Sequence, residues 1–165
     1  MRALGAAAVV PGECYLTGGA TAVLLGWRAT TLDVDIALEP EQDEVLRAIP
    51  RLKDELSINV ELASPGDFIP LPPGWRARSA FIERVGTLSF RHFDAVSQAL
   101  AKLERGHAQD LEDVRTMLDR HLVDATQLRG ALREIEPELY RFPAIDPREF
   151  RRSVEAFVGR AGSRP

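Results

Sequence analysis

The chain is poor in the residues that build disulfide frameworks and zinc sites. Cys14 is the only cysteine among 165 residues, so no intrachain disulfide can form. The three histidines, His92, His107 and His121, are not spaced with acidic residues in a pattern typical of zinc ligands. Stability must therefore come from an ordinary hydrophobic core, and a composition of 45% hydrophobic residues is sufficient for one.

Basic charge and long apolar runs are also lacking. There are 21 Lys and Arg residues against 25 Asp and Glu residues, a formal net charge of -4, which excludes binding of nucleic acid by bulk positive charge. No run approaches the roughly 18 apolar residues of a membrane span. Residues 1–10 can be a signal peptide or a short helix packed on the core, and their minimal apolar run favours the helix. We expect a cytoplasmic protein with no membrane association.

The character of the sequence changes near residue 93, although its length is that of one domain. Before that point, short apolar runs alternate in the order strand, helix, strand, helix, strand, hairpin. After it, the apolar residues follow helical spacing. We predict the α/β (α+β) class: a mixed sheet with flanking helices in residues 1–93, and a helical segment in residues 94–165 packed on it as one compact unit.

The local patterns predict the following elements. Strands are expected at 14–17, 33–38, 57–62, 81–84 and 87–93. Helices are expected at 20–25, at 40–56 with Pro50 kinking or dividing it, at 93–105, at 108–120, after Asp124 with Gln127 in a capping box, and after Asp146. Residues 64–74 read as a Pro-rich loop and residues 159–165 as a frayed tail.

A glycine pair and two aspartates form the most informative constellation. Asp33 and Asp35 lie one residue apart on a predicted strand, so both carboxylates share a face. Such close like charges are tolerated mainly around a cation, and carboxylates suit Mg²⁺ with a phosphate-bearing substrate. Gly18 and Gly19, at a strand-to-helix turn, would let backbone N–H groups approach an anion. Each feature alone is more often plain backbone geometry or a solvated strand; together they predict phosphoryl or nucleotidyl transfer.

The segment from Gly18 to Asp35 resembles the nucleotidyltransferase superfamily with the DNA polymerase β-like fold. Within it, the segment is most similar to minimal bacterial nucleotidyltransferases, including the AbiEii-type toxins of toxin–antitoxin systems. The resemblance implies that residues 1–93 are a nucleotidyltransferase-like core. It also implies that Asp33 and Asp35 hold Mg²⁺ and that the glycine turn contacts the nucleotide phosphates.

A third carboxylate usually comes from a neighbouring strand in such families. Glu61 is the candidate, because it stands between apolar residues on a predicted strand, and Asp67 is the alternative. A solvated edge position is the other interpretation of Glu61. Arg28 either holds a substrate phosphate or caps a helix end. Thr17 either offers its hydroxyl to the phosphates or caps the helix, and capping is favoured.

The resemblance extends into the helical half. Lys102 and Arg105, followed by Asp110 and Asp113, are similar to a Lys…Arg…Asp-Leu-x-Asp pattern of AbiEii-like proteins. This implies that Lys102 contacts the nucleotide phosphates and that Asp110 assists catalysis. Each pair shares a helix face, and an antiparallel helix pair would let the two faces meet. The alternative is a set of exposed ion pairs of little energetic weight.

Three functional interpretations remain. The first, which we favour because all three acids are present, is an enzyme with two Mg²⁺ ions, or Mn²⁺ in their place, at Asp33, Asp35 and Glu61. It would move a nucleoside monophosphate from an NTP to an acceptor hydroxyl on a small molecule, a protein or tRNA. A toxin role with an antitoxin partner follows only from the resemblance. The second is a non-catalytic nucleotide-binding or protein-interaction module. The third is an α/β domain with structural aspartates.

Overall fold

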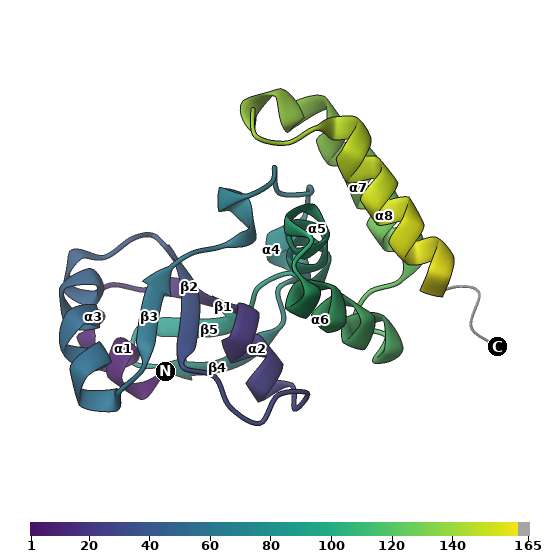
Figure 1. Cartoon of the computed structure of the whole chain (residues 1–165). Helices are drawn as coiled ribbons and strands as arrows, with labels where there is room; N and C mark the ends of the chain where they lie inside the picture. The colour runs from purple at the N-terminus through teal and green to yellow at the C-terminus, as the bar shows by residue number, and fades with distance from the viewer. Residues whose placement is uncertain (162–165) are drawn as a thin grey trace. The chain divides into compact units, whose positions relative to one another are not determined.

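Five strands form one mixed sheet, which confirms the predicted α+β class (Figure 1). In this computed structural model, residues 1–161 are described, and side chains are described for residues 1–159. The strand order is β3-β2-β1-β5-β4, with β2 antiparallel to β1, β3 parallel to β2, β5 parallel to β1, and β4 antiparallel to β5. The strands are β1 Gly12–Thr17, β2 Asp33–Glu39, β3 Asn59–Leu62, β4 Phe81–Val85 and β5 Leu88–His92.

Helices precede, connect and follow these strands. They are α1 Arg2–Ala7, α2 Gly18–Leu24, α3 Asp43–Leu56, α4 Trp75–Arg78, α5 Ala95–Arg105, α6 Ala108–Asp119, α7 Ala125–Ile135 and α8 Pro147–Ala161. Two short 3₁₀ segments are η1 Pro65–Asp67 and η2 Glu136–Arg141. Within the described residues, none of these helices has the length and apolarity needed to cross a membrane.

The chain divides into two compact units. The sheet unit comprises Met1–Ser64 and Ser79–Phe93, and the helical unit comprises Pro65–Arg78 and the chain from Asp94 onward. The predicted change of character at residue 93 coincides with a unit boundary. The Pro-rich segment, which the sequence analysis grouped with the strands, belongs to the helical unit. Packing of the two as one compact unit stays a prediction.

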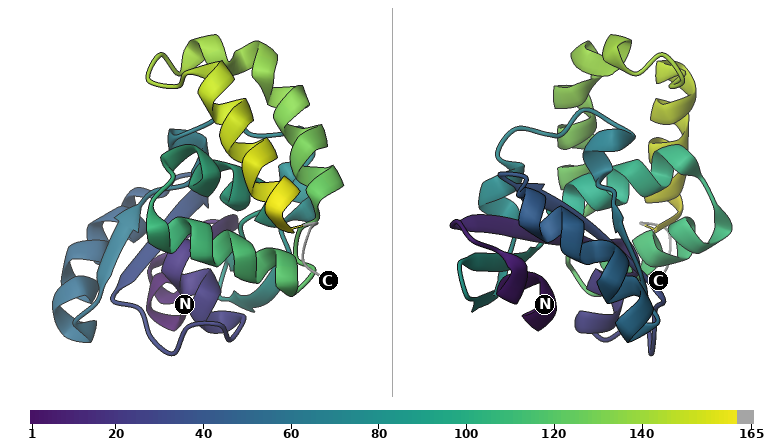
Figure 2. Two further views of the ribbon diagram at one scale, coloured as in Figure 1. Left: turned by 45° about the vertical axis from the view of Figure 1, so that its right-hand side comes forward. Right: turned by 90° about the vertical axis from the view of Figure 1, so that its left-hand side faces the viewer.

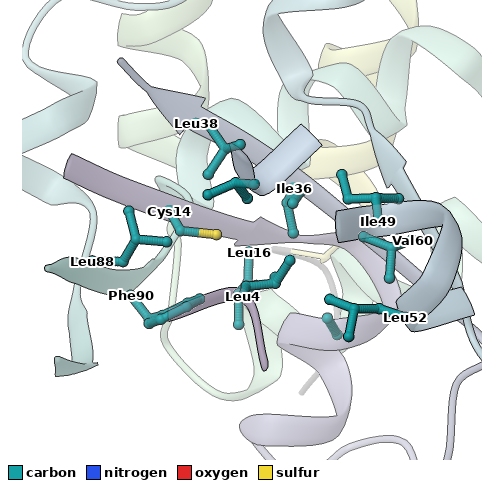
Figure 3. Close-up of a cluster of buried hydrophobic side chains, with 12 residues drawn as sticks. Leu4, Cys14, Leu16, Ile36, Leu38, Ile49, Leu52, Val60, Leu88 and Phe90 are labelled. Atoms are coloured by element: carbon teal, nitrogen blue, oxygen red, sulfur yellow. The ribbon is translucent and has the colours of Figure 1, made fainter. Parts of the chain in front are cut away.

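Alternation along the strands builds the core of the sheet unit on one face (Figure 3). Cys14 and Leu16 of β1 point to the same side as Ile36 and Leu38 of β2, and all four are buried. Side chains of α1, α2, α3, β3 and β5 complete the cluster: Leu4, Ala20, Val45, Ile49, Leu52, Val60, Leu88 and Phe90. Full burial of such side chains contributes about 1.5–3 kcal/mol each. The odd-numbered residues of β1, β2 and β3 therefore face the opposite side of the sheet.

Buried contacts explain where α3 departs from its prediction. The helix is continuous through Pro50, so a division there is wrong, whereas a kink stays a prediction. Val45 before the proline and Leu52 after it are both buried, so packing holds the two halves in one helix. The helix also begins three residues later than predicted. Gln42 stays outside it and uses its side-chain amide to bond the backbone of Val9 and Val10.

A buried aspartate ties the Pro-rich segment to α5 in the helical unit. Asp94 caps α5 by accepting from the Ser97 backbone N–H at 3.1 Å and its hydroxyl at 2.6 Å. The Arg78 guanidinium donates two hydrogen bonds of 2.9 Å to the same carboxylate. Hydrogen bonding to Asp94 raises the pKa of Arg78. The link shows why Pro65–Arg78, with the unpredicted helix α4, belongs with the later helices.

The remaining helix ends follow the capping signals closely. Asp124 and Gln127 form the predicted capping box of α7, and Asp146 accepts hydrogen bonds from two N–H groups in the first turn of α8. Two views show α7 and α8 running side by side (Figure 2). The predicted frayed tail is wrong for residues 159–161, which continue α8, and residues 162–165 lie outside the described part of the chain.

Candidate active site

Three carboxylates lie on one face of neighbouring strands in the sheet unit. Thr17 of β1 is in register with Asp35 of β2, and Asp35 is in register with Glu61 of β3. Asp33 lies two residues before Asp35 on β2 and shares its face, which is opposite the face that carries the hydrophobic cluster. Adjacent strands are about 4.8 Å apart, so the register places Asp35 beside Glu61, and the predicted sharing of one face by Asp33 and Asp35 is confirmed. We call Asp33, Asp35 and Glu61 the strand acids.

Gly18 is needed because the Asp35 carboxylate lies directly against it. Its φ angle is +56°, a left-handed conformation that favours glycine. A Cβ atom at this position would come within 2.8 Å of Asp35 Oδ2. The absence of a Cβ atom at Gly18 therefore lets the Asp35 carboxylate lie against the turn between β1 and α2. The helix begins at Gly18 itself, two residues before the predicted start.

Gly19 admits the loop that leads into β2. A Cβ atom there would collide with the Thr31 hydroxyl. This hydroxyl donates to the Asp33 carbonyl at 2.9 Å, and its oxygen accepts from the Asp33 N–H at 3.2 Å. The second glycine thus serves close packing that anchors the first strand acid. The sequence analysis missed Thr31, and only its position two residues before Asp33 could have indicated it. Contact of either glycine with nucleotide phosphates stays a prediction.

Thr17 and Arg28 flank the turn on either side. Thr17 occupies the N-cap position of α2 but makes no capping hydrogen bond with its side chain, so the favoured interpretation as a side-chain cap is wrong. Its extended backbone points the side chain to the same face as Asp35. Arg28 is half-buried, and its backbone N–H closes the end of α2 by bonding to the Ala22 carbonyl. Phosphate binding by Thr17 and Arg28 stays a prediction.

Asn59 is a site residue that the sequence analysis missed. Its amide Nδ2 donates to Glu61 Oε1 at 2.8 Å and to Asp33 Oδ1 at 3.3 Å, and so lies between two of the strand acids. Strand alternation could have found it, because it stands two residues before Glu61 on β3. Within the described residues, no three His, Cys, Asp or Glu side chains gather closely enough, as they stand, to hold a metal ion.

The four charged residues predicted on α5 and α6 meet inside the helical unit. Lys102 Nζ binds Asp110 Oδ1 at 2.9 Å and Asp113 Oδ2 at 2.7 Å, and Arg105 binds Asp110 at 2.8 Å. The lysine side chain is only 9% exposed and that of Asp113 only 3%. The alternative of exposed ion pairs is therefore wrong. We call these four residues the helix cluster. The roles of Lys102 in nucleotide binding and of Asp110 in catalysis stay predictions.

Two other reactive side chains of the sheet unit are accounted for by packing. Cys14 is fully buried, and burial raises the pKa of its thiol to about 12, so it stays protonated at neutral pH. His92 places Nδ1 3.3 Å from the Thr21 hydroxyl, and burial lowers its pKa. Because Thr21 donates its own proton to the Leu16 carbonyl, its oxygen accepts from His92. Neither residue lies on the face of the strand acids.

The strand acids offer carboxylate oxygens, which are the type of ligand that a hard divalent cation binds. Carboxylate oxygens are the ligands that Mg²⁺ prefers, and Mg²⁺ usually takes one or two carboxylates together with water and substrate phosphates. Two such carboxylates, Asp35 and Glu61, are in register on one sheet face, which is the structural feature that fits this donor set. Asp67, the alternative third carboxylate, lies in η1 of the helical unit, whereas Glu61 shares the sheet face with Asp33 and Asp35.

Comparison with known proteins agrees with this geometry at the level of the family. Residues 9–153 match the model of a family described as nucleotidyltransferase of unknown function (DUF6036). The match spans most of the chain, including both units, and the chain therefore belongs to this nucleotidyltransferase family. No curated protein and no solved structure matches the chain.

Proposed function

We propose that this member of the nucleotidyltransferase family transfers a nucleoside monophosphate from an NTP to an acceptor hydroxyl, with the strand acids holding two Mg²⁺ ions. The observation that carries the proposal is the placement of Asp35 against Gly18, with Asp33 and Glu61 on the same sheet face. The DNA polymerase β-like fold and the AbiEii-type relationship are part of the proposal, supported by the motif from Gly18 to Asp35. Mn²⁺ is expected to substitute for Mg²⁺.

The chain's own residues have distinct tasks in this reaction. In the in-line displacement, the acceptor oxygen would bond to the α-phosphorus while the bond to the leaving pyrophosphate breaks and the hydroxyl proton passes to water. Bound Mg²⁺ would supply charge stabilisation for this step. Asp33 and Asp35 would hold the cation from one strand, and Glu61 from the next. Gly18, where a Cβ atom would come within 2.8 Å of Asp35 Oδ2, would let this carboxylate lie directly against the turn that contacts the phosphates. Arg28 and the Thr17 hydroxyl flank the glycine turn in sequence and would donate hydrogen bonds to the triphosphate.

The helix cluster supports a structural assignment more directly than a catalytic one. Lys102 already binds two carboxylates, and the two acids and two bases of the cluster match in number. A buried network of this kind joins α5 to α6. We propose that Lys102 and Asp110 hold α5 against α6 in the helical unit. A nucleotide phosphate that bound Lys102 would compete with Asp113 for its ammonium group.

One observation favours a second candidate, a nucleotide-binding module without catalysis. The described carboxylates do not gather into a group of three as they stand. A protein that kept the nucleotidyltransferase fold for binding alone would need the glycine turn but not a complete metal site. Retained NTP affinity with no transfer would identify this function.

The proposal is tested by transfer of label from four α-³²P-labelled NTPs with Mg²⁺ or Mn²⁺ to small-molecule, protein and tRNA acceptors. Asp35→Asn is expected to lower transfer by on the order of 100-fold, since a metal ligand contributes several kcal/mol. Asp43→Asn is the matched control, because Asp43 is an exposed aspartate on α3 that pairs with Arg47. Equal activity of wild type and Asp35→Asn would contradict the metal assignment.

The toxin role needs its own experiment. A toxin would arrest growth when expression is induced in the cytoplasm, and the arrest would depend on the strand acids. Wild-type chain is compared with Asp35→Asn under the same promoter, with protein levels matched by immunoblot. Growth arrest by wild type alone supports a toxin with a protein antitoxin as partner; unaffected growth in both strains removes this part of the proposal.

A further inference from the structure

Asn59 is the chain's single asparagine, and its side chain lies between two carboxylates of the proposed metal site. We propose that Asn59 is a positioning residue, whose amide sets the orientation in which Asp33 and Glu61 receive a cation. The inference rests on the proposed function, because it assigns a role within the same site.

The amide can serve both acids and still leave each one able to bind metal. A carboxamide nitrogen carries two N–H donors, which matches its two carboxylate partners, Glu61 Oε1 at 2.8 Å and Asp33 Oδ1 at 3.3 Å. Each carboxylate has two oxygens and about four lone-pair positions. The hydrogen bonds therefore engage one oxygen of each acid and leave the other oxygen for a cation.

The position of Glu61 shows why such a partner is needed. Glu61 lies on β3, which is an edge strand of the sheet, and Glu61 is exposed. A free glutamate side chain loses up to about 2 kcal/mol of rotamer entropy when it is ordered. The 2.8 Å hydrogen bond from Asn59 restricts those rotamers before a metal binds. The donor's partial positive charge also offsets the repulsion between Asp33 and Glu61.

A neutral donor suits this task better than a lysine or arginine would. A cationic side chain between the carboxylates would cancel the charge that attracts a divalent ion, as happens around Lys102 in the helix cluster. The Asn59 amide orients the acids and leaves their negative charge in place. Metal-binding carboxylates are commonly hydrogen-bonded in this way, and loss of such a partner lowers metal affinity about 10–100-fold.

The test is Mn²⁺ binding measured by electron paramagnetic resonance, with the metal alone and no nucleotide. Asn59→Leu, which keeps the branched skeleton of the side chain without its hydrogen-bond donors, and Asn59→Ala are expected to weaken Mn²⁺ binding at least about tenfold. Leu62→Ala is the matched control, since Leu62 lies on the same strand with its side chain on the opposite face, and is expected to bind Mn²⁺ like wild type. Thermal unfolding confirms that each variant is folded.

The outcomes separate this inference from the function on which it rests. Mn²⁺ binding by wild type, with unchanged or tighter binding by the folded Asn59 variants, overturns the positioning role and leaves the proposed metal site intact. Absence of Mn²⁺ binding by wild type overturns both. Weaker binding by the Asn59 variants together with wild-type binding by Leu62→Ala supports the inference. If Asn59→Leu fails to fold, the smaller Asn59→Ala decides the question.

Discussion

The sheet unit and the helical unit each contain a group of acidic side chains, and they treat negative charge differently. In the helix cluster, Asp110 and Asp113 are buried against Lys102, which supplies the compensating charge from the chain itself. Among the strand acids, Asp33 and Glu61 instead share the neutral amide of Asn59. Buried carboxylates with a built-in cation have their charge compensated within the fold, whereas carboxylates oriented by a neutral donor keep their charge for a ligand.

The largest expected effect is on the stability of the helical unit. Lys102→Met leaves two carboxylates buried without their cation and is expected to lower the free energy of unfolding by about 3–5 kcal/mol. Urea denaturation measures the loss. Arg47→Met is the control, because its pair with Asp43 is exposed and should contribute less than about 1 kcal/mol. A loss as small as that of the control would show that the helix cluster is not structural.

The next prediction compares the two candidates for the third carboxylate, Glu61 in the sheet unit and Asp67 in the helical unit. Glu61→Gln is expected to lower nucleotidyl transfer by about 100-fold, because Glu61 shares the sheet face with Asp33 and Asp35. Asp67→Asn, in the helical unit, is expected to stay within about threefold of wild type. Initial rates with labelled NTP measure both. The reverse order would move the third carboxylate from β3 to η1.

A smaller effect isolates the contact between the glycine turn and Asp35. Gly18→Ala is expected to cost about 1–3 kcal/mol of unfolding free energy, through its positive φ angle and the collision with Asp35 Oδ2. Gly26→Ala is the matched control, since Gly26 also has a positive φ but has nothing within 4 Å of an added Cβ atom. The difference between the two variants, in stability and in Mn²⁺ affinity, reports the contact. Identical values for both would mean that backbone conformation alone requires Gly18.

The smallest effect is expected at a helix cap remote in sequence from every proposed ligand. Asp124→Ala removes the capping box of α7 and should lower the free energy of unfolding by about 1 kcal/mol. Mn²⁺ and NTP affinity should be unchanged, because the cap belongs to the helical unit. Calorimetry on the same sample measures both quantities. A change in metal affinity would mean that the α7 cap influences the strand acids, and that the two units do not act independently.

Local signals predicted most elements because they act over a few residues. Asp124 with Gln127 and Asp146 with Pro147 marked helix starts that the structure confirms. Alternation in residues 33–38 placed Asp33 and Asp35 on one face, away from buried Ile36. Patterns failed where distant contacts decide. Packing carries α3 through Pro50, and hydrogen bonds from Arg78 to Asp94 attach the Pro-rich segment to the helical unit.

The candidate site shows the same division at the level of single residues. The sequence identified Gly18, Asp33, Asp35 and Glu61, because a glycine turn and acids at alternate strand positions leave a visible pattern. Asn59 was not predicted, although it stands at an alternate position two residues before Glu61, because its acceptor Asp33 on β2 is known only once the strand register is known.

By itself the sequence determined the composition of the core, the strand faces and the helix ends, because periodicity and capping are local properties of the chain. Only the tertiary structure decided the register that aligns Asp35 with Glu61 and the pairing that buries Lys102 between Asp110 and Asp113. Register and burial depend on contacts between residues far apart in the chain, and those contacts decide which carboxylates receive a cation from the protein.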